Sequence, residues 1–183
     1  REGRRPLHGL RARVRGVLVI AGLVAGLGAT AHAEDVNVAL QGRVRQSSTL
    51  PAGEAWRAID GSLNGNFSEG SIAHTNGGTA TVWFELDLGR AMPIDRVLLH
   101  NRTDCCHDRI NGIRVELSAV PCDAATPAVV ASAPAVTGAP AIYNAPFAEG
   151  PSARYVCLRQ SAGALINLAE IEVMSSASWV KGV

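Results

Sequence analysis

Lysine, aromatic residues and charged residues in general are scarce in this 183-residue sequence. Lys181 is the single lysine although arginine is common, and we interpret that bias as a property of the coding DNA rather than of function. Aromatic residues make up 4% and charged residues 18%, against 47% hydrophobic residues. This composition is typical of a globular chain, and it excludes an intrinsically disordered or collagen-like protein.

A sustained helical pattern is also missing, because no window keeps the 3.6-residue period of an amphipathic helix. Instead, apolar residues alternate with polar ones at residues 82–88 and 113–119, which predicts half-buried strands. Residues 120–152 are rich in Ala, Pro and Gly and are interpreted as a long connection. Short strands between long loops predict an all-β fold, an antiparallel β-sandwich.

No apolar run is long enough for a membrane span: residues 16–29 fall short of the ~20 residues that a helix needs to cross a bilayer. This run follows six arginines and precedes Ala31, His32 and Ala33, an order typical of a secretory signal. We therefore expect a signal peptide at residues 1–33, a β-sandwich domain at 34–175 and a tail at 176–183. A membrane anchor is the alternative for the first segment.

The formal net charge of +1 combines two parts of opposite sign. Residues 1–33 hold six Arg and one Glu and carry +5, whereas residues 34–183 hold 11 basic and 15 acidic residues and carry −4. A domain with this acidic balance lacks the basic face that nucleic-acid binding needs. We expect a secreted protein, extracellular or periplasmic, that binds no nucleic acid and does not insert into a membrane.

The residues with the most chemistry lie at 100–109, in the segment HNRTDCCHDR. A zinc site is one interpretation, but adjacent cysteines do not match the spaced pairs of zinc sites. A catalytic thiol is a second interpretation, which oxidation after export disfavours. A disulfide between Cys105 and Cys106 is the third; it closes no useful loop, so chain entropy does not justify it.

A ring formed by adjacent cysteines would be a rigid apolar knob in a polar loop. Arg102 and Arg109 flank this knob with planar donor groups, and His74 in the preceding long loop offers a further polar partner. Sugars have apolar C–H faces and hydroxyl groups, so this combination favours a carbohydrate site. The alternative for the two arginines is solvation or a surface ion pair with Asp104 or Asp108.

Residues 101–112 (NRTDCCHDRING) resemble the signature of the F-type lectins, or fucolectins, in which a loop His precedes an Arg-x-Asp-Cys-Cys-x-x-Arg motif. The resemblance extends to residues 37–40, 58–61, 82–88, 154–156 and 168–173. It implies a jelly-roll β-sandwich that binds L-fucose and fucosylated glycans without catalysis.

Several residues match functional positions of that family. His74, Arg102 and Arg109 match the residues that bind sugar hydroxyls, and Cys105 and Cys106 match a vicinal disulfide that packs on the sugar ring. The family also assigns a steadying role to Asp104 and a place near the fucose methyl group to Leu50 and Phe67.

The resemblance further implies one structural calcium ion. The matching positions are the side chains of Asp60 and Glu170, with Ser71 as a further ligand, and the backbone carbonyls of Arg57, Ser62 and Ala169. Calcium binds six to eight oxygens of these types. A turn cap for Asp60 and a solvent-facing strand position for Glu170 are the alternatives.

Two cysteines of eel-type members are replaced here by Ile72 and Ala169, and an apolar contact is expected instead. The remaining Cys122 and Cys157 are expected to form a disulfide across the 120–152 connection, with two buried free thiols as the alternative.

Two other function classes compete with a lectin. A glycosidase would need two carboxyl groups over the sugar, such as Asp104 and Asp108, but neighbouring arginines disfavour a general acid there. A discoidin-like adhesion module would need exposed apolar side chains on loops, for which Trp56 and Trp179 are the candidates. For a lectin with one site per chain, we expect a homo-oligomer that gains avidity.

Overall fold

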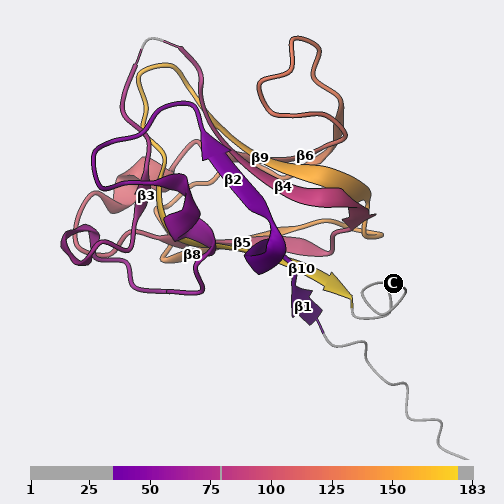
Figure 1. Ribbon diagram of the computed structural model, residues 1–183, viewed down its shortest axis with the longest axis horizontal. Helices are drawn as coiled ribbons and strands as arrows, with labels where there is room; N and C mark the ends of the chain where they lie inside the picture. The colour runs from indigo at the N-terminus through magenta and orange to yellow at the C-terminus, as the bar shows by residue number, and fades with distance from the viewer. Residues whose placement is uncertain (1–34, 79, 177–183) are drawn as a thin grey trace, which may run out of the picture. The chain divides into compact units, whose positions relative to one another are not determined.

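The computed structural model describes residues 35–78 and 80–176, so the predicted signal peptide, Thr79 and most of the predicted tail lie outside it. Two antiparallel sheets stack face to face (Figure 1). The strands are β1 Asp35–Asn37, β2 Arg43–Gln46, β3 Ala73–His74, β4 Val82–Pro93, β5 Arg96–Asn101, β6 Arg114–Ser118, β7 Val129–Ser132, β8 Ile142–Pro146, β9 Ser152–Gln160 and β10 Asn167–Ser176. Short 3₁₀ turns are η1 Ala39–Gln41, η2 Ala55–Ile59, η3 Phe67–Glu69 and η4 His107–Ile110.

The strand order shows that neighbours in each sheet are distant in sequence. One sheet has the order β1-β10-β5-β8, with β3 paired to β10, and the other has the order β2-β4-β9-β6-β7. This arrangement confirms the predicted antiparallel β-sandwich. Among the described residues there is no α-helix, and no helix is long and apolar enough to cross a membrane.

The core lies between the sheets and follows the alternation seen in the sequence. On β4, Val82, Phe84 and Leu86 are buried, while Trp83 on the opposite face is only partly covered. On β6, Val115 and Leu117 are buried in the same way. Because successive strand residues point to opposite faces, one face of each strand packs between the sheets.

The predicted connection at residues 120–152 is wrong in part, because it contains β7 and β8. Each of these strands forms the edge of a sheet, β7 beside β6 and β8 beside β5. Their side chains Val129, Val130 and Ile142 are about half exposed. Edge strands of this kind lack the alternating burial that marks the central strands, so the sequence pattern did not reveal them.

The contact expected in place of the missing eel-type disulfide involves β3 and β10. Ala73 pairs with Leu168, and Ile72 and Ala169 come directly beside this pair. The side chains of Ile72 and Ala169 are fully buried. Two buried apolar residues therefore occupy the positions of the absent cysteines.

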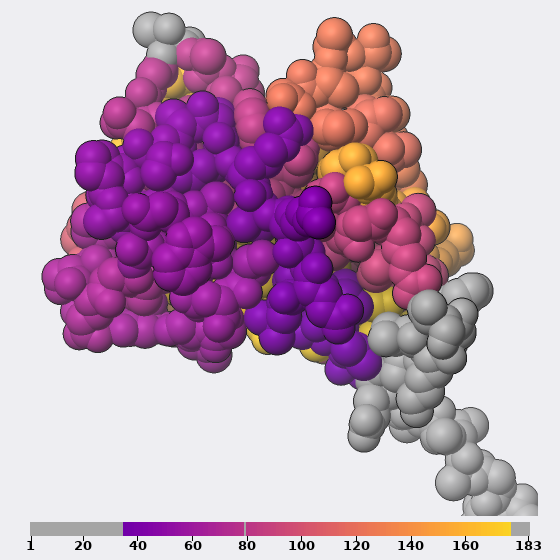
Figure 2. Space-filling model, in the orientation of Figure 1, coloured from indigo at the N-terminus to yellow at the C-terminus, as the bar shows by residue number. Residues whose placement is uncertain are grey.

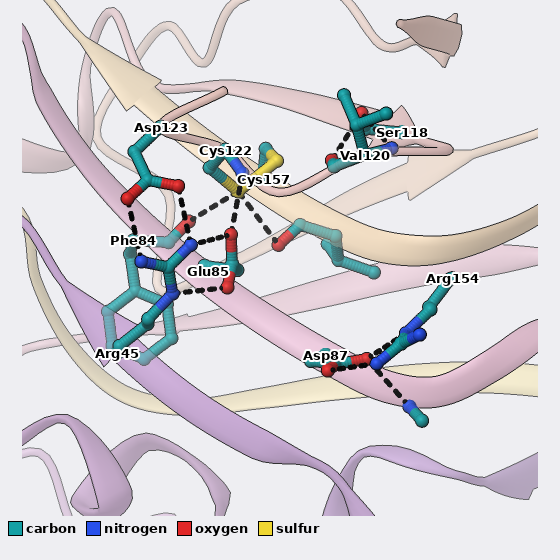
Figure 3. A network of polar contacts seen from close by, with 12 residues as sticks. Arg45, Phe84, Glu85, Asp87, Ser118, Val120, Cys122, Asp123, Arg154 and Cys157 are labelled. Carbon is teal, nitrogen blue, oxygen red and sulfur yellow. Dashed lines mark hydrogen bonds and ion pairs between the residues drawn. A yellow bond between two sulfur atoms is a disulfide. The ribbon is translucent and has the colours of Figure 1, made fainter. Parts of the chain in front are cut away.

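A disulfide between Cys122 and Cys157 ties the loop after β6 to the outer face of β9, as predicted. Figure 3 shows the polar contacts around it, in which Glu85 accepts a hydrogen bond from the Cys122 amide at 2.5 Å. Arg45 binds both oxygens of Glu85, at 2.6 and 2.9 Å, and also pairs with Asp123. The disulfide and the ion pairs thus hold the same loop on the sheet.

Removing this disulfide should lower stability substantially. It joins residues 35 positions apart, so it restricts the unfolded chain. We expect Cys122→Ala with Cys157→Ala to lower the free energy of unfolding by about 3 kcal/mol in urea titrations. The matched control is Cys105→Ala with Cys106→Ala, whose bond closes no loop. Equal midpoints for the two double variants would contradict this account.

Candidate functional site

The connections before β3 and after β5 meet at one end of the sandwich, where β3 lies in Figure 1. The segment coloured indigo to purple, residues 35–75, covers much of the face shown in Figure 2. His74 ends β3, Phe67 begins η3, and Arg102 follows β5. The fold therefore brings together residues from three separate segments of the chain.

Arg102 is held rigidly although it follows the end of a strand. Its Nε and Nη2 atoms donate to the two carboxylate oxygens of Asp104 at 2.6 and 2.9 Å. The guanidinium carbon lies 4.8 Å from the ring centroid of Phe67, within the range of a cation–π contact. With only 8% of its surface exposed, Arg102 presents one fixed face of its guanidinium.

His74 is buried, and both of its ring nitrogens have partners. Nδ1 lies 2.7 Å from the carbonyl oxygen of Thr75, so we assign the proton to Nδ1. Nε2 is then an acceptor and lies 3.3 Å from Nη1 of Arg109. Burial lowers the pKa of His74, and the positive charges of Arg109 and Arg102 lower it further, against the effect of the Thr75 carbonyl. His74 is consequently neutral at pH 7.

Cys105 and Cys106 form a disulfide with their Cα atoms 3.8 Å apart. Cys106 adopts a left-handed backbone conformation, with φ 59° and ψ 34°, and η4 begins directly after it. Because both sulfurs are bonded to each other, neither is a thiolate ligand for zinc or a free nucleophile. The structure thereby decides between the three interpretations of this segment in favour of the vicinal disulfide.

Backbone contacts that the sequence did not reveal fix the loop around these residues. The amide of Thr103 donates to the carbonyl of Gly65 at 2.8 Å. The side-chain amide of Asn101 donates to the carbonyls of His107 and Pro140 at 2.9 and 3.1 Å. No local sequence motif indicates such contacts, because the partners are distant in sequence or are backbone atoms.

Gly53 is a further position that sequence reasoning missed. A Cβ atom at Gly53 would lie 2.7 Å from the Cβ of His74, closer than packing allows. The Gly53 carbonyl also accepts the amide proton of His74 at 2.9 Å. The loop after β2 therefore needs glycine here in order to lie against His74.

The other predicted sugar-site residues are partly brought together. Phe67 lies edge-on to His74 at 5.7 Å between ring centroids, and the amide of Leu50 donates to the His74 carbonyl at 3.0 Å. Asp104 forms its ion pair with Arg102, whereas no hydrogen bond or ion pair joins Asp104 to Arg109 in the described part of the chain. Asp104 thus steadies one arginine rather than both.

The carboxyl group of Asp104 is unsuited to acid catalysis. Hydrogen bonds from Arg102 lower the pKa of Asp104 to about 2. A carboxyl group with this pKa holds no proton at neutral pH, so it is no general acid. Fixed donors, one neutral imidazole and an apolar disulfide are instead the elements of a site that holds a polyhydroxylated ring.

The predicted calcium positions centre on Glu170 in β10. Glu170 is 1% exposed; its Oε1 accepts the amide proton of Gly61 at 3.1 Å, and its Oε2 has no hydrogen-bond partner among residues 35–78 and 80–176. Burial raises the pKa of Glu170 to about 7, with the charge of nearby Asp60 adding to the effect. A buried carboxylate oxygen without a partner is costly unless a cation compensates it.

The other predicted ligands mostly have local contacts of their own. Asp60 Oδ1 accepts from the Ser62 amide at 2.8 Å, so the expected turn cap is present as well. The Ser71 hydroxyl donates to the Asn66 carbonyl at 2.9 Å, which leaves its oxygen able to accept a cation. Ala169 adjoins Glu170 in β10, and the side chain of Arg57 pairs with Glu54. These oxygen types match calcium.

Comparisons with known proteins agree with this description. The family model of the NedA-like, galactose-binding domain matches residues 57–158. Fucolectin-4 of Anguilla japonica is 39% identical over 108 residues, which cover 54% of this chain and 58% of the relative. The chain spans about half the length of the curated relatives it matches, such as 54% of the fucolectin of Anguilla anguilla.

Two solved structures match over nearly their whole length. A variant of the lectin binding domain of lectinolysin, complexed with Lewis b, superposes with a TM-score of 0.69 at 30% identity, covering 79% of this chain and 99% of that one. A fucose binding module of Streptococcus pneumoniae gives 0.68 at 30% identity, covering 76% and 94%. With its Arg-x-Asp-Cys-Cys-x-x-Arg loop on this sandwich, the chain belongs to the NedA-like, galactose-binding domain family and has fucolectins among its relatives.

Proposed function

We propose that this protein is a non-catalytic lectin that binds L-fucose and fucosylated glycans through His74, Arg102 and Arg109. The observation that carries the proposal is the meeting of the ion-paired guanidinium of Arg102, the guanidinium of Arg109 and a neutral histidine in the region of a vicinal disulfide. The fucolectins and the fucose binding module among its relatives support the choice of sugar.

The donors and acceptors of the site complement a hydroxylated ring. Nη1 of Arg102, and Nε and Nη2 of Arg109, have no hydrogen-bond partner within the described residues, so they can donate to sugar hydroxyls. The neutral His74 Nε2 has one lone pair, so it accepts from a sugar hydroxyl in place of Nη1 of Arg109. Guanidinium groups hold their charge and plane, so the donors stay oriented when the site is empty. Little side-chain entropy is then lost on binding.

Apolar surfaces of the site suit the remaining faces of the sugar. The Cys105–Cys106 disulfide and Phe67 are partly exposed beside the polar groups. L-Fucose has a methyl group in place of a hydroxymethyl group, and burying it and the ring C–H face adds about 0.8 kcal/mol per carbon group. Polar contacts fix the orientation, while this burial supplies affinity.

We also propose that calcium binds at Glu170 and Asp60, with Ser71 and the carbonyls of Arg57, Ser62 and Ala169 as further ligands. The buried, unpartnered Oε2 of Glu170 supports this assignment. When bound, the ion supplies positive charge that neutralises the buried carboxylate. The turn after η2 is then held to β10 through the same residue that already accepts from Gly61.

The proposal also includes export of the protein and its assembly into a homo-oligomer. The two disulfides support an oxidising compartment, in agreement with the secretory signal expected at residues 1–33. One sugar site per chain binds weakly, so a homo-oligomer would supply avidity for glycan surfaces.

Removing one donor should abolish most of the sugar affinity. We expect L-fucose titrated calorimetrically to bind wild type at one site per chain, and Arg102→Ala to weaken it at least tenfold. Arg90→Gln is the matched control, because Arg90 is exposed on β4 and forms no ion pair in the described residues. The proposal is wrong if wild type does not bind L-fucose, or if both variants bind it with the affinity of wild type.

Stability should depend on pH through His74. Its pKa in the folded protein is lower than in the unfolded chain, so the unfolded chain binds more protons between the two values. This contribution is fully present above about pH 6.5 and is lost as pH falls from there through the lowered pKa. Urea unfolding at pH 7 and pH 5 should show a smaller loss for His74→Gln than for wild type.

The control for this pH dependence is His107→Gln, since His107 is exposed and lies in the loop after β5 rather than beside β3. It should retain the wild-type loss of stability on acidification. Identical pH dependence in His74→Gln and wild type would show that His74 does not titrate as its surroundings require.

Calcium should stabilise the fold through Glu170. We expect a chelator to lower the melting temperature of wild type by several degrees, and added calcium to restore it. Glu170→Gln should not respond to calcium, whereas Glu149→Gln, at an exposed turn, should respond as wild type does. A melting temperature independent of calcium in wild type would remove the ion from the proposal.

A further inference from the structure

Two arginines lie opposite each other at the end of the second sheet. Arg114 on β6 is the cross-strand partner of Arg159 on β9. Like charges in this position destabilise a sheet. Arg159 is anchored, since its Nε pairs with Glu116 at 2.8 Å and its Nη2 donates to the Cys122 carbonyl at 2.7 Å. Arg114 is exposed and has no ion pair within the described residues, so one positive charge remains uncompensated.

Both arginines line an open hollow of about 420 Å³, together with small and uncharged polar residues. The other lining residues are Thr81, Gly112, Gln160 and Ser161. No acidic side chain of the described residues is among them. Guanidinium groups bind planar oxyanions with two parallel hydrogen bonds, so the hollow matches an anionic group.

The hollow adjoins the proposed sugar site through a second hollow of about 310 Å³. Gln160 and Ser161 line both, and Arg109, which contacts His74, lines the second one. Ala164 and Leu165 give the second hollow an apolar wall opposite the polar side chains. A glycan leaving the fucose position past Arg109 would therefore pass over the 161–165 loop toward Arg114.

The two hollows along this path differ in the charge of their lining residues. Asp108 lines the hollow beside Arg109 and would repel an anion there. Arg114 and Arg159 line the outer hollow, where Glu116 offsets only one of them. A neutral sugar is thus favoured next to the fucose position and an anionic group farther out.

We propose that Arg114 and Arg159 form an anion subsite, which binds a sulfate ester or a carboxylate of a glycan whose fucose occupies the proposed site. This inference rests on the proposed function and adds a preference for acidic fucosylated glycans. Arg159 supplies a fixed guanidinium, and the exposed Arg114 supplies the charge that a ligand can take up.

The test compares neutral, sulfated and uronate-bearing forms of fucosylated oligosaccharides, with the acidic group at several positions, by calorimetry. We expect at least one acidic form to bind about three- to tenfold more tightly than its neutral parent at low salt. Raising the salt concentration should reduce this gain, because the subsite is open to solvent. Sulfated and uronate forms distinguish the two sources of the anion.

Arg114→Gln should remove the gain and leave L-fucose affinity unchanged, since Arg114 lies outside the fucose site. Arg90→Gln removes the same charge elsewhere and should retain the gain. Arg159 is left intact, because its loss would strand Glu116. The anion subsite alone is refuted if L-fucose binds but no acidic form has a higher affinity than its neutral parent. It is also refuted if both variants lose the gain in affinity equally. Absence of L-fucose binding would instead overturn the proposed function.

Discussion

The bidentate ion pair between Arg102 and Asp104 determines where the candidate site presents its donors. It fixes the guanidinium plane against Phe67, which in turn lies edge-on to His74. His74 then orients Arg109 through Nε2, because Nδ1 is already committed to the Thr75 carbonyl. Each side chain is therefore positioned by the one before it, and the chain of contacts joins η3, β3 and the loop after β5 into one site.

The sandwich supports this arrangement with constraints outside the site. The loop after η2 meets β10 at Glu170, next to the β3–β10 pairing that places His74. On the other sheet, the Cys122–Cys157 disulfide and Arg45 hold a covering loop whose Cys122 carbonyl also receives Arg159. The two ends of the proposed binding path thus depend on separate anchors, one in each sheet.

Sequence patterns predicted the central strands well because burial on one face leaves a period of two, as at Val82, Phe84 and Leu86. They failed for β7 and β8, whose exposed side chains, such as Val129 and Ile142, carry no such period. The vicinal cysteines and their flanking arginines were predictable as a local motif. The support from Gly53 and Gly65 was not, since it consists of backbone contacts between distant segments.

Because Gly53 lies so close to His74, the loop after β2 contains positions that tolerate substitution and one position that does not. Residues 47–52 are largely exposed or half-buried and can change side chains without moving the imidazole. Any side chain at position 53 would displace His74, and Arg109 would then lose its contact with His74. A loop library that seeks new glycan preferences can therefore diversify the rim of the proposed site while His74 stays in place, provided that this one glycine is kept.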